Sequence, residues 1–214
     1  MLIIFDLDDT LIDTSGAVTP FKLRNIFEIL MQKAPTDLEF QELVMINETS
    51  LKTKDAIEAF GLKKGVSRKA IEKAISEMSA PLPSDFSIPC TPNAKEILEF
   101  YRKLYPLALV TGGFPPFQRE KMEKAGIEAS IFSKIAIPED SIKKPFYKDL
   151  MIEFSKAPAD IWVCGDRVPM DLAPAKELGF KTVHIRWGRG KRIKHEPWID
   201  FSIQDLSELR NIIL

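Results

Sequence analysis

The first fourteen residues, MLIIFDLDDTLIDT, place acidic side chains directly after an apolar run that is typical of a buried strand. Asp6 and Asp8 are two residues apart, so in an extended backbone they face the same side with Cα atoms about 6.6–7 Å apart. That gap suits a phosphoryl group, because one carboxylate can attack phosphorus while the other exchanges a proton with the leaving oxygen. We therefore predict a phosphoryl-transfer site at this strand end.

The same acids pose an electrostatic problem. Two like charges about 4 Å apart at an effective dielectric near 20 repel each other by roughly 4 kcal/mol. Asp9 and Asp13 have a simpler interpretation, since aspartate is common in turns, where its side chain bonds to nearby backbone. We interpret these two as turn residues, which leaves the crowding of Asp6 and Asp8 against an apolar run to be explained.

Strand and helix patterns that could position the acids alternate along most of the chain. Apolar runs predict parallel strands buried on both faces at Leu2–Leu7, Leu107–Thr111, Ile161–Cys164 and Lys181–Ile185, with a weaker candidate at Lys134–Ile137. Helical patterns lie between them, at Asn93–Leu104, Pro116–Ala125, Lys148–Lys156 and Asp171–Leu178. This alternation predicts an α/β fold with a Rossmann-like doubly wound parallel sheet, whose ligands bind beyond the carboxyl ends of the strands.

One segment interrupts this alternation. Four amphipathic helical patterns follow one another without strands between them, at Phe21–Lys33, Leu38–Glu48, Lys52–Phe60 and Ser67–Met78. We predict a helical domain at 15–88, inserted after the first strand of a catalytic core formed by 1–14 and 89–214. The alternative is one continuous mixed domain with a helical edge.

Composition narrows the functional classes. The 214 residues include 30 basic and 31 acidic side chains, a formal net charge of -1, which does not favour a nucleic-acid or membrane-surface binder. No apolar run is long enough to span a membrane, and the N-terminus lacks the pattern of a signal peptide. Cys90 and Cys164 suggest reduced thiols, so we expect a cytoplasmic protein. The basic stretch beginning at Arg186 is interpreted as a solvated loop, and no feature specifies an oligomeric state.

The stretch FDLDDTLID resembles the first signature of the haloacid dehalogenase superfamily of phosphohydrolases, Asp-x-Asp-x-Thr at the end of the first strand. Three further signatures of that superfamily follow in the expected order. LALVTGG supplies a threonine that ends a strand, Thr111, and SIKKPFYKDL supplies a lysine before proline, Lys144. VCGDRVPMDLAPAKELGF supplies Gly-Asp and a second acid, as Asp166 and Asp171. The ordered set is far more specific than any one motif.

The resemblance implies a role for each matched residue. Thr111 would donate its hydroxyl to a phosphate oxygen, helped by the backbone N–H groups of Gly112 and its neighbour Gly113. Lys144 would offset the charge between Asp6 and the phosphate. Lys143 is its rival, and Lys144 is preferred because Pro145 follows it directly.

The second acidic pair would complete a metal site. Asp166 closes an apolar strand and so projects into the same crevice as Asp6. Mg²⁺ prefers oxygen ligands, and the resemblance implies Asp6, Asp166 and the backbone carbonyl of Asp8 as its ligands. Asp171 is expected to cap a helix N-terminus and to support the metal site without binding the ion directly. The ion would neutralise the crowded carboxylates.

Together these features predict a Mg²⁺-dependent phosphatase that hydrolyses a small phosphorylated metabolite through an aspartyl-phosphate, with the helical insertion as a cap over the site. A phosphomutase that shares this intermediate is the alternative within enzymes. A phospho-accepting regulatory switch is the alternative from a different class. Dehalogenation is disfavoured because Asp8 supplies a leaving-group acid that the departure of halide does not need.

Overall fold

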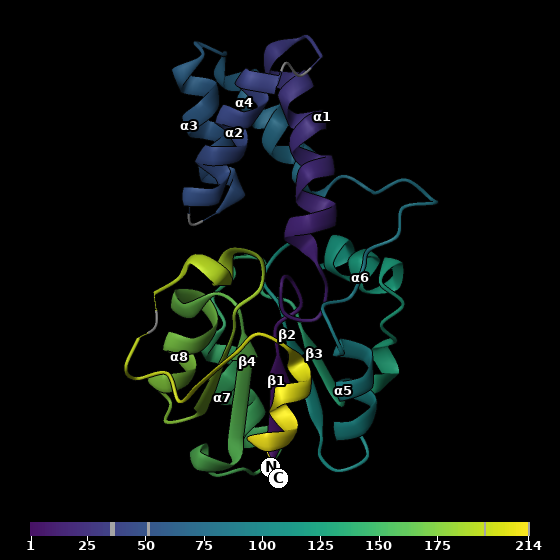
Figure 1. Cartoon of the computed structure of the whole chain (residues 1–214), viewed down its shortest axis with the longest axis vertical. Helices are drawn as coiled ribbons and strands as arrows, with labels where there is room; N and C mark the ends of the chain where they lie inside the picture. The colour runs from purple at the N-terminus through teal and green to yellow at the C-terminus, as the bar shows by residue number, and fades with distance from the viewer. Residues whose placement is uncertain (35–36, 51, 195, 214) are drawn as a thin grey trace. The chain divides into compact units, whose positions relative to one another are not determined.

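The computed structural model describes residues 1–34, 37–50, 52–194 and 196–213. Its contacts divide the chain into two compact units, one formed by Met1–Ser15 with Leu82–Leu214 and the other by Gly16–Pro81. The first unit holds the sheet, and the second is helical (Figure 1). The observed division thus follows residues 15 and 81, whereas the sequence predicted it after residues 14 and 88.

Long-range hydrogen bonds explain why the return segment 82–88 belongs to the sheet-bearing unit. The ammonium of Lys124 donates to the carbonyl oxygens of Pro83 and Ser84, each at 2.7 Å. The carbonyl of the same lysine accepts from the backbone N–H of Ile88 at 3.1 Å. The predicted domain boundary at residue 88 is therefore corrected, since partners distant in the sequence fix this segment.

The first unit is built on a six-stranded parallel sheet with the order β3-β2-β1-β4-β5-β6. The strands are β1 (Leu2–Phe5), β2 (Leu107–Val110), β3 (Lys134–Ala136), β4 (Ile161–Gly165), β5 (Lys181–Ile185) and β6 (Phe201–Ile203). The prediction of a Rossmann-like α/β core is confirmed. The edge strand β6 was not predicted, because it has only three residues and two of them are exposed.

Helices cover both faces of this sheet. They are α5 (Ala94–Tyr101), α6 (Pro115–Lys124), α7 (Lys144–Glu153) and α8 (Ala173–Lys176). The strand order reverses between β1 and β4, so right-handed crossovers carry α5 and α6 to one face and α7 and α8 to the other (Figure 1). Ligands of such folds bind at the carboxyl ends of the strands beside this reversal.

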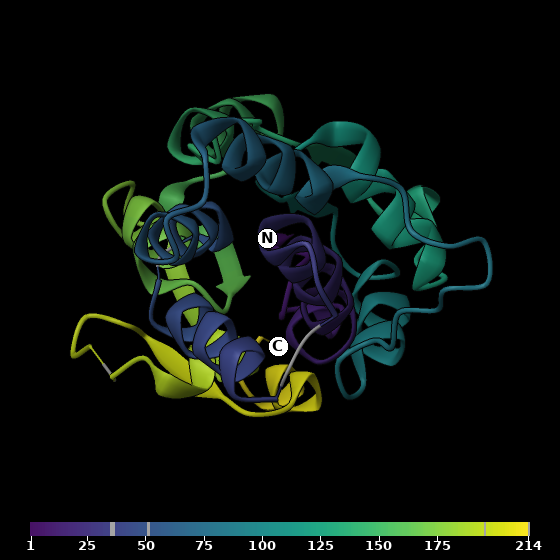
Figure 2. The ribbon, with the colours of Figure 1, turned by 90° about the horizontal axis from the view of Figure 1, so that it is seen from above.

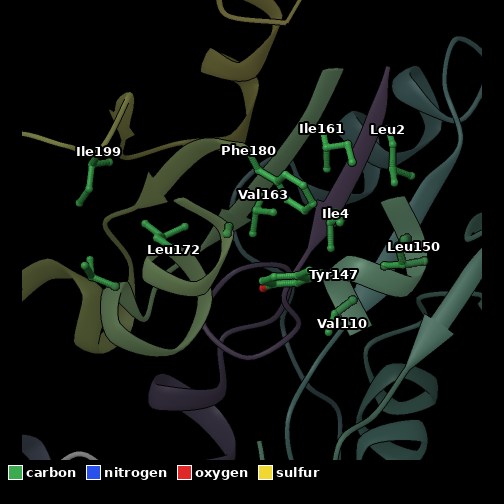
Figure 3. Close-up of a cluster of buried hydrophobic side chains, with 13 residues drawn as sticks. Leu2, Ile4, Val110, Tyr147, Leu150, Ile161, Val163, Leu172, Phe180 and Ile199 are labelled. Atoms are coloured by element: carbon green, nitrogen blue, oxygen red, sulfur yellow. The ribbon is translucent and has the colours of Figure 1, made fainter. Parts of the chain in front are cut away.

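The buried residues of the sheet alternate between these two faces, as strand geometry requires. On one face, Tyr147 and Leu150 of α7 pack against Ile4, Val110 and Val163 (Figure 3). The intervening strand residues are also buried, so the strands are apolar on both sides. A strand end held in this way is a rigid support for charged side chains.

The second unit is a four-helix assembly of α1 (Thr19–Met31), α2 (Asp37–Thr49), α3 (Thr53–Lys63) and α4 (Arg68–Ser76), seen from above in Figure 2. Its core is formed by one apolar stripe of each helix, namely Leu23, Ile26, Phe27, Leu30, Leu43, Ile57, Phe60, Ile71 and Ala74. Gly61 lets α3 and α4 approach closely, because a Cβ there would lie 2.6 Å from the Ile71 side chain. Among the described residues, no helix has the length and apolar character needed to cross a membrane.

Candidate active site

The register of the sheet brings the predicted acids to one edge. Phe5, the last residue of β1, pairs with Cys164 of β4. The backbone N–H of Asp6 then donates to the carbonyl of Cys164 at 3.0 Å, which extends the pairing by one step. Asp6 and Asp166 therefore leave the two strands that flank the reversal of strand order, and Thr111 leaves the neighbouring β2.

A buried lysine joins two of these acids. The Lys143 ammonium lies 2.5 Å from Asp6 Oδ1 and 2.5 Å from Asp171 Oδ1. All three side chains are at most 7% exposed. Burial alone would lower the pKa of Lys143, but the charges of Asp171 and Asp6 raise it well above its ordinary value. Lys143 therefore remains an ammonium within the acidic cluster.

The structure corrects the choice between the two lysines. Lys144 lies at the surface, where its ammonium is 2.5 Å from Glu177 Oε2 and both side chains are well exposed. Consecutive residues at a helix start point in directions about 100° apart, so only one of the pair can face the acids. Proline after Lys144 did not identify that residue, and Lys144 is not brought to the site.

Asp171 has a different local role from the one expected. It lies within the short π-helix Val168–Leu172, and the residue preceding α8 is Leu172, so Asp171 does not cap α8. Its Oδ2 instead accepts from the backbone N–H of Arg167 at 2.9 Å. With Oδ1 on Lys143, this carboxylate holds the buried ammonium in place.

Three carboxylates form a group with the dimensions of a cation site. One oxygen from each of Asp6, Asp166 and Asp171 lies within 4.8 Å of the others. Both oxygens of Asp166 are buried without a hydrogen-bond partner among the described residues. Burial, followed by the charges of Asp171, Asp9 and Asp6, raises the pKa of Asp166 well above its ordinary value.

Asp6 is subject to the same effect. Burial, opposed by the charge of Lys143 and assisted by the carboxylates of Asp171 and Asp8, raises the pKa of Asp6 to about 7. Buried carboxylates in this condition need additional positive charge to ionise fully. The all-oxygen donor set and its crowding fit Mg²⁺.

The loop after β2 has the features of a phosphate site. The backbone N–H of Thr111 donates to Ala136 O at 3.1 Å, and that of Gly113 donates to Pro138 O at 3.0 Å, which fixes the loop. The Thr111 hydroxyl is buried and has no hydrogen-bond partner among the described residues. Gly112 is required sterically, because a Cβ there would lie 2.6 Å from the Ser141 side chain.

Asp8 occupies a separate environment from Asp6. β1 ends at Phe5, and Asp8 lies in the following turn, so the two acids do not share an extended strand as predicted. The Lys121 ammonium lies 2.5 and 2.6 Å from the two oxygens of Asp8, and Thr14 Oγ1 donates to Asp8 Oδ1. Burial would raise the pKa of Asp8, but Lys121, Thr14 and Gln118 together hold it below its ordinary value.

Of the remaining two acids of the first stretch, Asp9 lies in a turn, in agreement with the sequence interpretation, whereas Asp13 lies outside the turn and contacts a distant side chain. Asp9 has a left-handed φ of 56° and accepts from the Ser15 backbone N–H at 2.8 Å. Asp13 Oδ1 accepts from Trp187 Nε1 at 3.1 Å. Both interactions stabilise the loop that carries Asp8.

Sequence reasoning did not identify two side chains that contact Asp8. Gln118 and Lys121, three residues apart on α6, both reach Asp8. The available signal was a helix starting directly after the Thr111 loop with two polar residues on one face. The basic side chains of Arg186, Lys191, Arg192 and Lys194 are exposed, in agreement with the interpretation of a solvated loop. Within that stretch, Gly190 packs against the backbone of Asp166, where a Cβ would lie 3.0 Å from the carbonyl oxygen.

Comparisons with known proteins agree with this geometry. A model of haloacid dehalogenase-like hydrolases matches residues 1–179. A glyceraldehyde 3-phosphate phosphatase from Methanocaldococcus jannaschii is 28% identical over 99% of this chain and 96% of its own length. A phosphoserine phosphatase from Thermus thermophilus is 34% identical over 56% of this chain and 50% of its own length.

Solved structures show the same fold. A Clostridium difficile protein described as a phosphatase superposes with a TM-score of 0.79 at 19% identity, covering 100% of this chain and 98% of its own. A Bacillus subtilis protein described as a haloacid dehalogenase hydrolase bound to magnesium gives 0.76 at 17% identity, covering 99% and 97%. The chain belongs to the haloacid dehalogenase-like hydrolases. The two curated relatives named above are phosphatases.

Proposed function

We propose that this chain is a Mg²⁺-dependent phosphomonoesterase that hydrolyses a small phosphorylated metabolite through an aspartyl-phosphate on Asp6. The observation that carries the proposal is the buried contact of Asp6 with Lys143 at 2.5 Å, beside the carboxylates of Asp166 and Asp171. This arrangement gathers a nucleophile, a fixed positive charge and a cation site at one strand end.

Two half-reactions follow from these residues. In the first, Asp8 must be protonated, although its lowered pKa favours the ionised form in the described structure, so it takes up a proton before the bond breaks. Asp6 then attacks phosphorus, the bond from phosphorus to the leaving oxygen breaks, and Asp8 gives that oxygen its proton. In the second, Asp8 accepts a proton from the water that attacks the aspartyl-phosphate, which releases phosphate and restores Asp6. Thr111, Gly112 and Lys143 bind the phosphoryl oxygens throughout.

The proposed Mg²⁺ ligands are the carboxylates of Asp6 and Asp166 and the backbone carbonyl of Asp8. When bound, the ion would neutralise the crowded carboxylates and polarise a phosphoryl oxygen of the substrate. Asp171 supports the site indirectly, because it holds Lys143 and is itself held by the backbone of Arg167.

The substrate we propose is a three-carbon sugar phosphate, with phosphoserine as the next choice, because relatives of the chain act on these compounds. The test is phosphate release from a panel of phosphomonoesters with Mg²⁺, including glyceraldehyde 3-phosphate, phosphoserine and larger sugar phosphates. We expect kcat/KM to be highest for glyceraldehyde 3-phosphate, the three-carbon sugar phosphate of the panel.

Other outcomes of this assay would contradict the proposal. Transfer of the phosphoryl group to a second sugar hydroxyl, without release of phosphate, would indicate a phosphomutase. A phosphorylated protein that persists for hours would indicate a regulatory switch. In a phosphatase, the phosphoprotein decays with the formation of inorganic phosphate.

The metal site can be tested without an activity assay. Ligand binding stabilises the folded state by about 2.7 kcal/mol at a hundred times Kd. For a chain of this size, that corresponds to a rise in Tm of roughly 5–10 °C. We expect this rise with Mg²⁺ in the wild type and its loss in Asp166→Asn. Asp149→Asn, which alters an exposed acid of α7, should keep it. An undiminished rise in Asp166→Asn would show that the ion binds elsewhere.

A further inference from the structure

We propose that Lys121 is a positioning residue for Asp8, which it orients for proton transfer to the leaving oxygen. The inference rests on the proposed function and assigns a role to a side chain outside the signature residues. It concerns the geometry of Asp8 and of the helix α6 that approaches it from the phosphate loop.

The Lys121 ammonium contacts both carboxylate oxygens of Asp8. It lies 2.5 Å from Oδ1 and 2.6 Å from Oδ2, while Thr14 donates to Oδ1 and Gln118 to Oδ2, so the three contacts together restrict the orientation of the carboxylate. The Lys121 side chain is 5% exposed, whereas that of Asp8 is 29% exposed. The buried partner therefore holds an acid that can still be reached from outside.

Gln118 connects this pair to the phosphate site. Its Nε2 donates to Asp8 Oδ2 at 3.1 Å and also to the carbonyl of Gly112. Gln118 and Lys121 lie on one face of α6, which begins directly after the loop containing Thr111 and Gly112. A single rigid helix thus sets the position of Asp8 relative to the loop proposed to bind the phosphoryl group.

This arrangement matters most where the leaving oxygen needs a proton. An alkoxide leaves poorly without one, so an alkyl phosphomonoester depends on correct placement of Asp8. 4-Nitrophenolate is a stable anion and departs without protonation. Displacement of a catalytic group by about 1 Å can cost on the order of 10²-fold in rate. Loss of Lys121 should therefore discriminate between the two kinds of substrate.

The experiment compares Lys121→Met with the wild type on glyceraldehyde 3-phosphate and 4-nitrophenyl phosphate. We expect kcat/KM, which covers the steps up to leaving-group departure, to fall about 10- to 100-fold for the alkyl ester. For the aryl ester the fall should be less than about threefold. Lys121→Arg should restore much of the loss, and Asp8→Asn should show the same dependence on the leaving group.

The matched control is Lys124→Met, which removes the same charge from the next turn of α6. Its contacts are with the carbonyls of Pro83 and Ser84, so kcat/KM should stay within about twofold for both esters. Tm is recorded for every variant. If Lys121→Met folds poorly, the kcat/KM values of Lys121→Arg on the two esters test the inference instead.

Two results would overturn this inference without contradicting the proposed function. The first is an equal loss on both esters in Lys121→Met and Lys121→Arg, which would indicate a purely structural role. The second is an unchanged kcat/KM in Lys121→Met beside a clear loss in Asp8→Asn. A wild type that releases no phosphate from either ester would instead overturn the proposed function, and this inference with it.

Discussion

Asp6→Asn is expected to abolish phosphate release while the protein keeps its fold. An asparagine side chain has the shape of the carboxylate but cannot form the acyl phosphate, and loss of a covalent nucleophile typically lowers kcat by about 10³-fold or more. The measurement is phosphate release with Mg²⁺ on the best substrate of the panel. Retention of wild-type activity would contradict the assignment of Asp6.

The stability of Asp6→Asn follows from the pKa of the acid. Burial first, with Asp171 and Asp8, raises the pKa of Asp6 from 3.8 to about 7 in the folded protein. Ionisation therefore opposes folding, and the stability that the protonated form contributes is lost as pH rises between about 4 and 7. At pH 7.5 without metal, we expect Tm of Asp6→Asn to equal or exceed that of the wild type.

A matched control separates this effect from a general response to lost charge. Asp149→Asn removes an exposed carboxylate from α7 and should change neither activity nor Tm appreciably. A large drop in Tm for Asp6→Asn would show that its contact with Lys143 outweighs the burial of its charge. In that case the loss of activity would result from unfolding and would not test the role of Asp6 as the nucleophile.

Much of the site was predictable because parallel strands end at a common edge. Asp6, Thr111 and Asp166 each directly follow a short apolar run, and the register of β1, β2 and β4 brings those ends together. No contact between distant side chains had to be known for that step. The ordered signatures then selected these three polar residues as candidate site residues.

The positions that were missed depend on packing that local sequence does not encode. Lys121 is 113 residues from Asp8 in the sequence, and their contact depends on how α6 lies over the turn after β1. The boundary at residue 81 similarly depends on Lys124 reaching the carbonyls of Pro83 and Ser84. Hydrophobic periodicity predicts a helix and its buried face, but not the partner of a polar side chain.

The choice between Lys143 and Lys144 shows this limit most clearly. A motif locates the pair to within one residue, whereas the rotation of a helix decides which side chain is buried. Lys143 lies against two buried carboxylates, and Lys144 forms a surface ion pair with Glu177. The two positions therefore make a matched pair for mutation.

Lys143→Met is expected to lose both activity and stability. Removing one partner of a buried ion pair typically costs about 3–5 kcal/mol, which for a chain of this size corresponds to a Tm lower by roughly 6–20 °C. The acids of Asp6 and Asp171 would then lack the ammonium that contacts both of them. Phosphate release should fall by about 10²-fold or more, because the charge proposed to face the phosphoryl group is gone.

Lys144→Met removes the same charge one residue away and should have little effect. Exposed ion pairs such as Lys144 with Glu177 contribute about 0–1 kcal/mol, so Tm should shift by at most a few degrees, roughly 2–4 °C. Saturating Mg²⁺ should recover part of the Tm lost in Lys143→Met, since a bound cation again places positive charge among the carboxylates. Full activity in Lys143→Met together with an inactive Lys144→Met would reverse the assignment of the two lysines. The start of α7 would then have to be rotated in the active protein, so that Lys144 and not Lys143 faced the acids.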